Sequence, residues 1–251
     1  MTRFIRFALL SALATVFAAA QDLPKAETIL DRYVEATGGK AAYEKHSHET
    51  MTGTISIPGP GLTGSLTRYA MAPDKEYSVL QLGPLGKAES GFSNGVAWEK
   101  NAITGPRIKS GAEKEQAARE ARFNAQVDWR KSFSKAETIG SESVNGEDCY
   151  KVVVTPPIGK PQTQYYSKKS GLLMKTTATA VNPMGEVMVE VEVSDYKDFD
   201  RVLYPTRSKS KMGPQQMDIV ITGMNFDQAI PAEFFELPAE IKALVEKAAA
   251  K

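Results

Sequence analysis

From residue 48 onward, the chain consists of short segments in which apolar and polar side chains alternate, separated by turn residues. A period of two places successive side chains on opposite faces, as in a β-strand with one buried face. In "GEVMVEVEVSDYKDF", for example, valines alternate with methionine and glutamate. We count roughly ten or eleven such segments, almost all joined by short turns. Because short turns join antiparallel neighbours, the sequence predicts one large antiparallel sheet.

Two Asn-Gly pairs, beginning at Asn94 and Asn145, mark hairpins in this sheet. Asn-Gly is the strongest short hairpin signal because both turn positions tolerate positive φ. The first pair lies in "GFSNGVAWEKNAITGPR", where Phe92 and Trp98 flank the turn. We expect both rings to anchor the hairpin to the hydrophobic interior. We expect "NAITGPR" to be the loop that leaves the sheet for a helical segment.

Helical patterns occur near both ends of the chain and in its middle. Residues 24–45 show apolar positions at a period of 3.6, and residues 238–250 do so again. Residues 110–133 begin with a very polar stretch and collect their apolar side chains at the end, in Trp129 and Phe133 among others. This order of elements predicts an α+β fold, a curved sheet with helices packed on one face and residues 110–133 as a lid.

Residues 1–20 have the features of a cleaved secretory signal peptide. Two arginines precede a charge-free run that ends in three alanines, and this run is too short to span a bilayer. The only cysteine is Cys149, so we expect a mature protein without a lipid anchor, an internal disulfide or a transmembrane segment. Because no Gly/Ser-rich or Pro-rich linker follows, we expect residues 21–251 to form one periplasmic domain.

The balance of charge argues against nucleic acid as a partner. The 251-residue chain has 31 Lys and Arg against 30 Asp and Glu. Two of the arginines and none of the acids lie in the predicted signal peptide, which leaves 29 basic and 30 acidic residues, a net charge of −1. Binding to phosphates requires a basic excess, which the mature chain lacks.

The sequence offers few candidates for chemistry. His46 and His48 are the only histidines, and on a strand they would share a face, so they are candidate metal ligands or hydrolytic residues. No third ligand and no nucleophile in a recognisable context accompanies them. Glu190 and Glu192 alternate with valines, which favours a solvated face, and residues 195–200 lack the glycine and closing glutamate of a calcium loop. We therefore predict no catalytic residue, metal or cofactor.

The apolar face of the predicted sheet can form either a solid core or the wall of a cavity for an acyl chain. Nine methionines favour adaptable apolar surfaces, but composition alone does not separate the two and, taken by itself, favours a solid core. An error of one residue would exchange the inner and outer faces. The residues expected to line such a cavity come from one face of several strands and from the lid: Met51, Ile55, Ile57, Leu66, Val79, Trp129, Phe133, Val189, Val191, Met217, Ile219 and Ile221.

Several segments follow one another in an order that is fairly specific. An N-terminal helix ending in Gly-Gly-Lys precedes the strands "GTISIPG" and "GSLTRYAMAPDKEYSVL" and the "GFSNGVAWEKNAITGPR" hairpin. Then "SVNGEDCYKVVVTP" leads to "QTQYYSKKSGLLMK", and "DFDRVLYPTR" leads to "MDIVITGMNFDQAIPAEFFELP". In this order they resemble the outer-membrane lipoprotein-sorting superfamily (LolA/LolB-like), in an exported branch of it.

This resemblance implies an unclosed β-barrel of about eleven antiparallel strands, with helices covering its concave face. In the carriers of the superfamily, the hollow holds lipid acyl groups, no cofactor is involved, and the work is binding and transfer. A relative with the same fold instead senses mislocalised lipoproteins. The carriers place a basic residue directly before the proline that ends their second strand, whereas here Ala72 precedes Pro73 and the nearest arginine is Arg68.

We therefore predict a periplasmic, non-enzymatic carrier whose partner is a lipid or a lipoprotein acyl chain, buried between sheet and lid. An envelope protein as a further partner and peripheral contact with a membrane are compatible with this role. One alternative is a regulatory or scaffold protein of the same fold that has a solid core and acts through protein–protein contacts. Another is a hydrolase or metal enzyme that uses His46 and His48.

Overall fold

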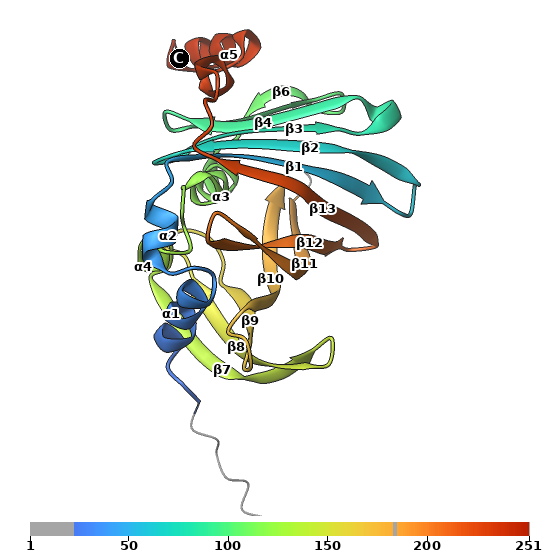
Figure 1. The fold of residues 1–251 in the computed structure, drawn as a ribbon. Helices are drawn as coiled ribbons and strands as arrows, with labels where there is room; N and C mark the ends of the chain where they lie inside the picture. Colours follow the sequence, from blue (N-terminus) through green and yellow to red (C-terminus); the bar gives the residue numbers. More distant parts are fainter. Residues whose placement is uncertain (1–22, 183–184, 251) are drawn as a thin grey trace, which may run out of the picture.

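One antiparallel sheet organises the part of the chain that the computed structural model describes, residues 23–182 and 185–250 (Figure 1). The sheet has 13 strands and is not closed into a barrel. This confirms the predicted fold class, with 13 strands in place of about eleven. The predicted signal peptide, residues 1–20, lies outside the described residues. Within the described ranges, no helix has the length and apolar character needed to cross a membrane.

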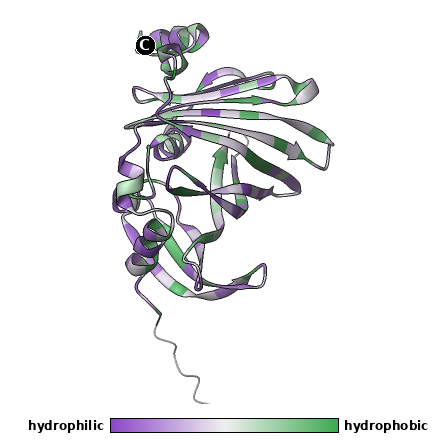
Figure 2. Cartoon of the chain, viewed as in Figure 1, coloured by the Kyte–Doolittle hydropathy of each residue, from purple (hydrophilic) through white to green (hydrophobic). Residues whose placement is uncertain are grey.

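The strands follow one another mainly through hairpins, and hydrophobic and hydrophilic residues alternate along them (Figure 2). Their bounds are β1 His48–Ile57, β2 Leu62–Met71, β3 Lys75–Gln81, β4 Lys87–Ser93, β5 Val96–Asn101, β6 Gly105–Ile108, β7 Lys135–Val144, β8 Glu147–Thr155, β9 Gln162–Ser167, β10 Leu173–Asn182, β11 Gly185–Phe199, β12 Val202–Met212 and β13 Gln215–Phe226.

Two meanders make up the sheet and meet at its centre. The strands β1 to β6 lie side by side in chain order in one meander, and β7 to β13 do so in the other. The pairing of β1 with β13 joins the two meanders, so β6 and β7 are the edges of the sheet. The last strand therefore lies in the middle of the sheet, next to the first.

β6 is a strand where the sequence predicted a loop. It lies in "NAITGPR", and its Gly-Pro pair is typical of a turn. Pro106 has no N–H to donate, yet it pairs with Lys100 of β5 in the register of the sheet. A proline is tolerated here because β6 is an edge strand, where one side of the backbone has no neighbour to receive a hydrogen bond.

Helices occur before, between and after the strands. The segment expected to be helical at 110–133 consists of two helices separated by residues 122–128, where Asn124 has a φ of 53°. Such a positive φ cannot continue a right-handed helix. The helices of the described residues are α1 Ala26–Ala36, α2 Lys40–Glu44, α3 Gly111–Ala121, α4 Trp129–Ser132 and α5 Ala239–Ala249, with short 3₁₀ helices η1 Gly83–Leu85 and η2 Ala232–Phe235.

α1 covers the concave face of β7, β8 and β9. Its apolar side chains recur at helical spacing, so one side of the helix faces the sheet. Thr138 of β7 donates a hydrogen bond of 2.7 Å to the carbonyl oxygen of Pro24, just before the helix. The apolar cluster between helix and sheet contains Ala26, Ile29, Leu30, Val34, Trp129, Val152, Val154 and Tyr166.

α3 packs in the concave face of the other meander (Figure 1). Its last residue, Ala121, is buried against Phe92 of β4 and Ala97 of β5, which are cross-strand partners. At the other end, Arg107 of β6 donates two hydrogen bonds, of 2.7 and 2.8 Å, to the carboxylate of Glu113. Because α3 also contacts β10, it bridges the two meanders across the hollow of the sheet.

α5 lies on the opposite, convex face, against the edge strand β6 (Figure 1). Lys100 of β5 pairs with Glu240 of α5 at 2.6 Å. On the same face, the ring of Phe234 in η2 stacks on Tyr77, which in turn stacks on Trp98. The fold therefore has helices on both faces of the sheet, whereas the sequence predicted them on one.

The hairpin at Asn94 is anchored on both faces. Phe92 is buried in the concave face and Trp98 in the convex face, with exposed fractions of 5% and 2%. The Trp98 indole lies over Gly91, its cross-strand partner, and a Cβ added at Gly91 would approach the indole nitrogen to 2.8 Å. The same Cβ would lie 2.9 Å from the carbonyl oxygen of Glu76. Glycine at position 91 is therefore what allows the indole to pack onto the sheet.

Replacing Gly91→Ala is expected to lower the free energy of unfolding by about 1–3 kcal/mol, the usual cost of overpacking a core. The indole of Trp98 must move outward, so its fluorescence emission should shift to longer wavelength. Gly59→Ala is the matched control, because nothing lies within 4 Å of a Cβ at that position. Urea unfolding of both variants checks this, and equal stability in the two would contradict the packing described.

Candidate functional site

A cavity of about 660 Å³ lies in the concave face, between the helices α1, α3 and α4 and the strands β9, β10 and β11. This volume is within the range of about 300–1,000 Å³ typical of small-molecule sites. The sheet contributes a mostly apolar wall from two paired strands, in which Ala178 of β10 lies opposite Val189 of β11. The interior of this part of the fold is therefore hollow rather than a solid core.

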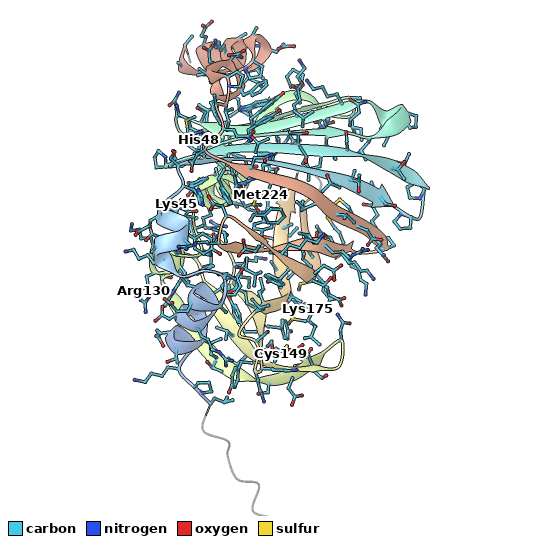
Figure 3. All side chains as sticks on the ribbon, in the orientation of Figure 1. Lys45, His48, Arg130, Cys149, Lys175 and Met224 are labelled. Atoms are coloured by element: carbon cyan, nitrogen blue, oxygen red, sulfur yellow. The ribbon has the colours of Figure 1, made fainter. Side chains whose placement is uncertain are left out.

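One end of the cavity is apolar and is closed by α1 and α4. Asp31 of α1 holds the two helices together: it accepts a hydrogen bond of 3.0 Å from the indole nitrogen of Trp129 and two of 2.8 Å from Arg130. Those bonds from Arg130 lower the pKa of Asp31. Arg130 is labelled beside these helices in Figure 3. The side chains at this end are Leu30, Tyr33, Trp129, Phe133, Tyr166 and Leu173.

Polar side chains line the rest of the cavity. They come from α3, from the segment between α3 and α4, from the turn between β8 and β9, and from β9 and β11. The sequence pattern alone does not mark them as lining residues, because a charged helix face is usually solvated. These side chains are Gln116, Arg119, Glu120, Gln126, Lys160, Gln162, Gln164 and Glu186.

The structure brings four of the twelve predicted lining residues together at this cavity: Trp129, Phe133, Val189 and Val191. Val79 was expected to point inward, but it lies on the convex face. Its cross-strand partners, Thr67 and Glu89, are on the same face of the sheet as Tyr77 and Trp98. The face of β3 was assigned one residue out of step, the error to which period-two patterns are prone. The remaining seven side chains point to the concave face but lie outside this cavity: Met51, Ile55, Ile57, Leu66, Met217, Ile219 and Ile221.

Around β1 and β13, the concave face is filled instead of hollow. Met51, Ile221 and Met224 form a buried cluster, against which Phe199 and Ile219 pack. Figure 3 labels Met224 within this region, between the two layers of the curved sheet. The strands that line the 660 Å³ cavity thus belong to one meander, and next to them Met51, Ile221 and Met224 form a packed apolar core.

Arg68 lies in the concave face near that core, with its charge neutralised by two acids. It donates hydrogen bonds to Glu49 of β1 and to Glu76 of β3, the latter at 3.1 Å. Burial alone would lower the pKa of Arg68, but the two carboxylates raise it, so the guanidinium stays charged. Arg68 therefore ties three strands together, and its described contacts are not with a lid helix.

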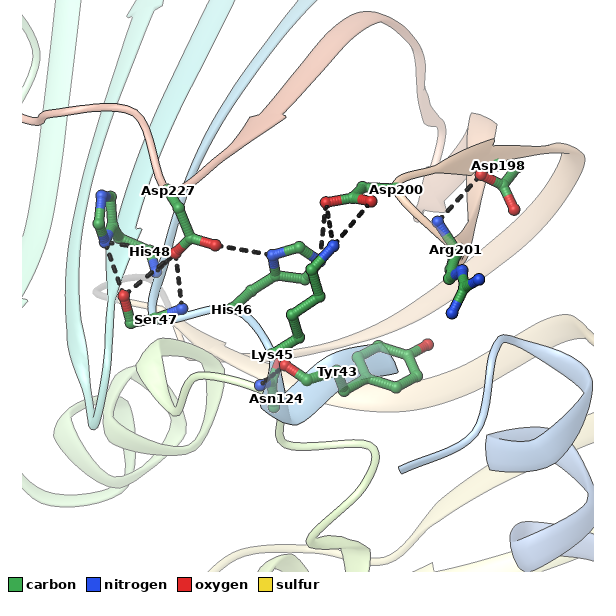
Figure 4. A network of polar contacts seen from close by, with 10 residues as sticks. All are labelled: Tyr43, Lys45, His46, Ser47, His48, Asn124, Asp198, Asp200, Arg201 and Asp227. Atoms are coloured by element: carbon green, nitrogen blue, oxygen red, sulfur yellow. Dashed lines mark hydrogen bonds and ion pairs between the residues drawn. The ribbon is translucent and has the colours of Figure 1, made fainter. Parts of the chain in front are cut away.

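His46 connects three separate parts of the chain (Figure 4). Its Nδ1 lies 2.8 Å from a carboxylate oxygen of Asp227, beyond the end of β13, and its ring stacks on Phe226 at 4.0 Å between centroids. Lys45, the neighbouring residue, pairs with Asp200 in the turn between β11 and β12 at 2.9 Å. The imidazole is buried in this contact, which gives it a structural role.

His48 and the other candidates for chemistry are also held by polar contacts. The Nδ1 of His48 lies 2.9 Å from the hydroxyl of Ser47. Glu190 lies within 3.8 and 3.9 Å of Lys175 and Lys211, and Asp195 pairs with an arginine. In the described part of the chain, no group of three or more His, Cys, Asp or Glu side chains is arranged to hold a metal ion.

Cys149 is fully buried on the convex side of β8. It packs with Val144 and Tyr165, and Figure 3 labels it in the meander of strands β7 to β13. Burial raises the pKa of its thiol, and the nearby carboxylate of Glu147 raises it further. A thiol in this setting is neither accessible nor activated, so Cys149 serves packing.

The Asp227 carboxylate predicts a pH dependence of stability. Burial would raise its pKa, but hydrogen bonds from the Ser47 backbone and from His46 outweigh burial and lower the pKa to about 2. Because the folded-state pKa is below the ordinary value of 3.8, the unfolded state takes up the proton first. The stabilisation is therefore complete above about pH 4 and is lost as the pH falls toward 2.

Urea unfolding at stepped pH values tests this. The wild type should lose stability between pH 4 and pH 2 more steeply than Asp227→Asn, which lacks the titrating group. Asp74→Asn, at an exposed position in the turn between β2 and β3, controls for the removal of one negative charge. Parallel pH profiles for the wild type and Asp227→Asn would show that the carboxylate has no such effect.

An open antiparallel sheet with helices and a ligand-sized cavity in its concave face is the feature by which solved structures can be compared with this chain. No family model and no curated protein matches the chain. A LolA superfamily protein from Nitrosomonas europaea has a TM-score of 0.59, 12% identity, and coverage of 86% of this chain and 99% of that one. A DUF1329 family protein from Desulfovibrio piger has a TM-score of 0.58 and 16% identity, covering 84% and 97%.

A third solved structure extends this likeness. A putative outer membrane lipoprotein-sorting protein domain from Vibrio parahaemolyticus has a TM-score of 0.53 and 13% identity, with coverage of 84% of this chain and 97% of that chain. At such identities the likeness establishes the fold alone. The chain therefore has the LolA/LolB-like fold, which confirms at the level of fold the resemblance found in the sequence.

Proposed function

We propose that this protein is a periplasmic carrier that binds an acyl chain of a lipid or a lipoprotein, without catalysis. The observation that carries the proposal is the cavity of about 660 Å³ between the helices and the sheet. Its apolar end is built from leucine, tyrosine, tryptophan and phenylalanine side chains. Such a hollow in an otherwise close-packed interior is suited to an apolar ligand that completes the packing.

The energy of burial is sufficient for useful affinity. Each methylene transferred from water into an apolar site contributes about 0.8 kcal/mol. Eight methylenes, about half of a long acyl chain, would contribute roughly 6 kcal/mol, to which hydrogen bonds at the polar end can add. Binding by burial needs neither a cofactor nor a nucleophile, in keeping with a carrier role.

The structural relatives support this role. The similar structure from Vibrio parahaemolyticus is described as a putative outer membrane lipoprotein-sorting protein domain, and that from Nitrosomonas europaea as a LolA superfamily protein. The signal-peptide pattern of residues 1–20 supports a periplasmic location. In this proposal, the mature domain comprises residues 21–251, with α3 and α4 as the lid.

Native mass spectrometry of the protein purified from a bacterial periplasm, together with lipid extraction, tests the function directly. Acyl lipid that co-purifies with the folded protein is the expected result. A protein that is empty after purification, and that does not take up a fluorescent fatty acid, would contradict the proposal. That outcome would favour a scaffold of the same fold that acts through protein contacts.

A pair of substitutions on β10 tests whether the cavity is the binding site. Ala178 lines the cavity, whereas its neighbour Thr177 has its side chain on the opposite face of the strand. Ala178→Phe should fill the cavity and lower the affinity for a fluorescent fatty acid at least about tenfold. Thr177→Phe, the matched control, should bind as the wild type does. An equal loss in both would place the ligand elsewhere or indicate general damage to the sheet.

A further inference from the structure

The two ends of the cavity differ in chemistry along the direction of β10. Leu173 and residues 178 to 181 of this strand line the cavity, and the eight residue steps from 173 to 181 span about 26 Å at the usual rise of a strand. Leu173, at one end, pairs with Tyr166 and faces the apolar side chains of α1 and α4. Val181, at the other end, lies opposite Glu186, beside the turn between β8 and β9. An elongated ligand would therefore meet apolar groups at one end and polar groups at the other.

Arg119 of α3 lines the polar end and has no acidic partner among the residues that the structure describes. Its Nη1 donates a hydrogen bond of 2.7 Å to the carbonyl oxygen of Ile158, in the turn between β8 and β9. Among the ion pairs formed by residues 23–182 and 185–250, none includes Arg119, and the side chain is only partly exposed. A guanidinium has five N–H donors, so several remain available to an oxyanion.

The backbone beside Arg119 leaves room for this guanidinium. Gly159 has a φ of +114°, and a Cβ added there would lie 3.3 Å from Nη2 of Arg119. Lys160, the next residue, also lines the cavity and pairs with Glu186 of β11. The polar end thus holds two cations, of which one is already matched by an acid.

Glu120 is the other acid at this end, and its charge is disfavoured. Burial raises the pKa of Glu120, because desolvation penalises the charged form, and the nearby carboxylate of Glu76 raises it further. Gln116 donates a hydrogen bond of 2.9 Å to the Glu120 carboxyl group. Although its side chain is partly open to solvent, Glu120, next to Arg119 in the chain, thus takes on its negative charge less readily than an ordinary glutamate.

The volume of the cavity limits the number of acyl chains. Its volume of about 660 Å³ lies in the middle of the range of about 300–1,000 Å³ typical of sites for one small molecule. One long acyl chain with a small head group fits this space. A ligand with two or three long chains would exceed a site of this size.

We propose that the cavity is specific for a single-chain amphiphile with an anionic head, whose oxyanion binds Arg119 while the chain extends toward Tyr33 and Trp129. This specificity rests on the proposed function as an acyl-chain carrier. A carboxylate, as in a fatty acid, and a phosphate, as in a single-chain phospholipid, share the required chemistry. Lys160 lies next to the proposed position of the head group. Its ion pair with Glu186 can be replaced by an ion pair with the bound oxyanion.

Isothermal titration calorimetry with probes of one chain length tests this. Hexadecanoate and hexadecyl phosphate carry the two anionic heads, hexadecan-1-ol is neutral, and dihexadecyl phosphate has two chains. At least one single-chain anion should bind about tenfold more tightly than the alcohol, the effect of a charge-assisted hydrogen bond. The tighter of the two anions then identifies the head group. The two-chain phosphate should bind at least about tenfold more weakly than its single-chain counterpart.

Substitutions assign the preference to Arg119. Arg119→Gln should reduce the ratio of anion to alcohol affinity to about twofold or less, and Arg119→Lys, which keeps the charge, should retain most of it. Lys114→Gln, at an exposed position of the same helix, is the control for loss of one positive charge and should keep the full ratio. If Arg119→Gln does not fold, the affinities of Arg119→Lys and of the wild type for the carboxylate and phosphate probes are compared instead. Equal affinities for both probes in both proteins would show that the guanidinium does not bind the head group.

The outcomes separate this specificity from the carrier function itself. If the alcohol binds as tightly as both anions, or if Arg119→Gln retains the tenfold ratio, the anionic site is overturned while acyl binding stands. If the two-chain phosphate binds as tightly as the single-chain one, the limit to one chain is overturned. If no probe binds, the proposed carrier function fails together with this specificity.

Discussion

The pairing of β1 with β13 is the contact on which the rest of the structure depends. It joins two meanders that would otherwise be separate sheets, and its partners are far apart in the chain: Ile55 lies opposite Ile219. The register shifts at Gly53, where a Cβ would lie 2.7 Å from the carbonyl oxygen of Val220, so the two backbones approach as only a glycine allows. Bulges of this kind increase the local twist of a sheet. The curvature that makes the concave face begins at this seam.

The two meanders then use their concave faces differently. Next to the seam, Met51 and Ile221 fill the space with side chains, and Arg68 is neutralised by acids from both neighbouring strands. Farther along, α3 bridges from one meander to the other, and side chains of α3, α4, β10 and β11 line the cavity together. The small side chains of Ala178 and Ala180 leave the hollow that the helices enclose. A rigid centre and a hollow flank are thus parts of one continuous sheet.

The sequence predicted the class of fold from simple periodicity, because alternation and short turns follow directly from the geometry of antiparallel strands. It placed Trp129, Phe133, Val189 and Val191 where the cavity is. It did not find Arg119, because a cation on a polar helix is normally solvated, and only the tertiary structure shows that this part of α3 faces the cavity.

Other differences have the same origin in tertiary structure. Val79 sits in a strand where apolar side chains occur on both faces, so alternation alone does not say which face is inside. The convex position of α5 depends on η2 and on the stacking of Phe234 against Tyr77, contacts between segments that are distant in sequence. Pattern and local propensity describe neighbours in the chain, whereas these placements are decided by long-range packing.

An open sheet has two unpaired edges, and such edges can recruit strands from other molecules. Here one of the two outer helices, α1 or α5, packs against each edge strand. α1 packs beside β7, where Pro24 accepts a hydrogen bond from Thr138, and α5 packs beside β6, where Pro106 interrupts the row of donors. Because the first and last strands lie at the centre, both terminal helices are free to reach outward to opposite borders. An open sheet whose edge strands are packed in this way is less prone to join edge to edge with copies of itself.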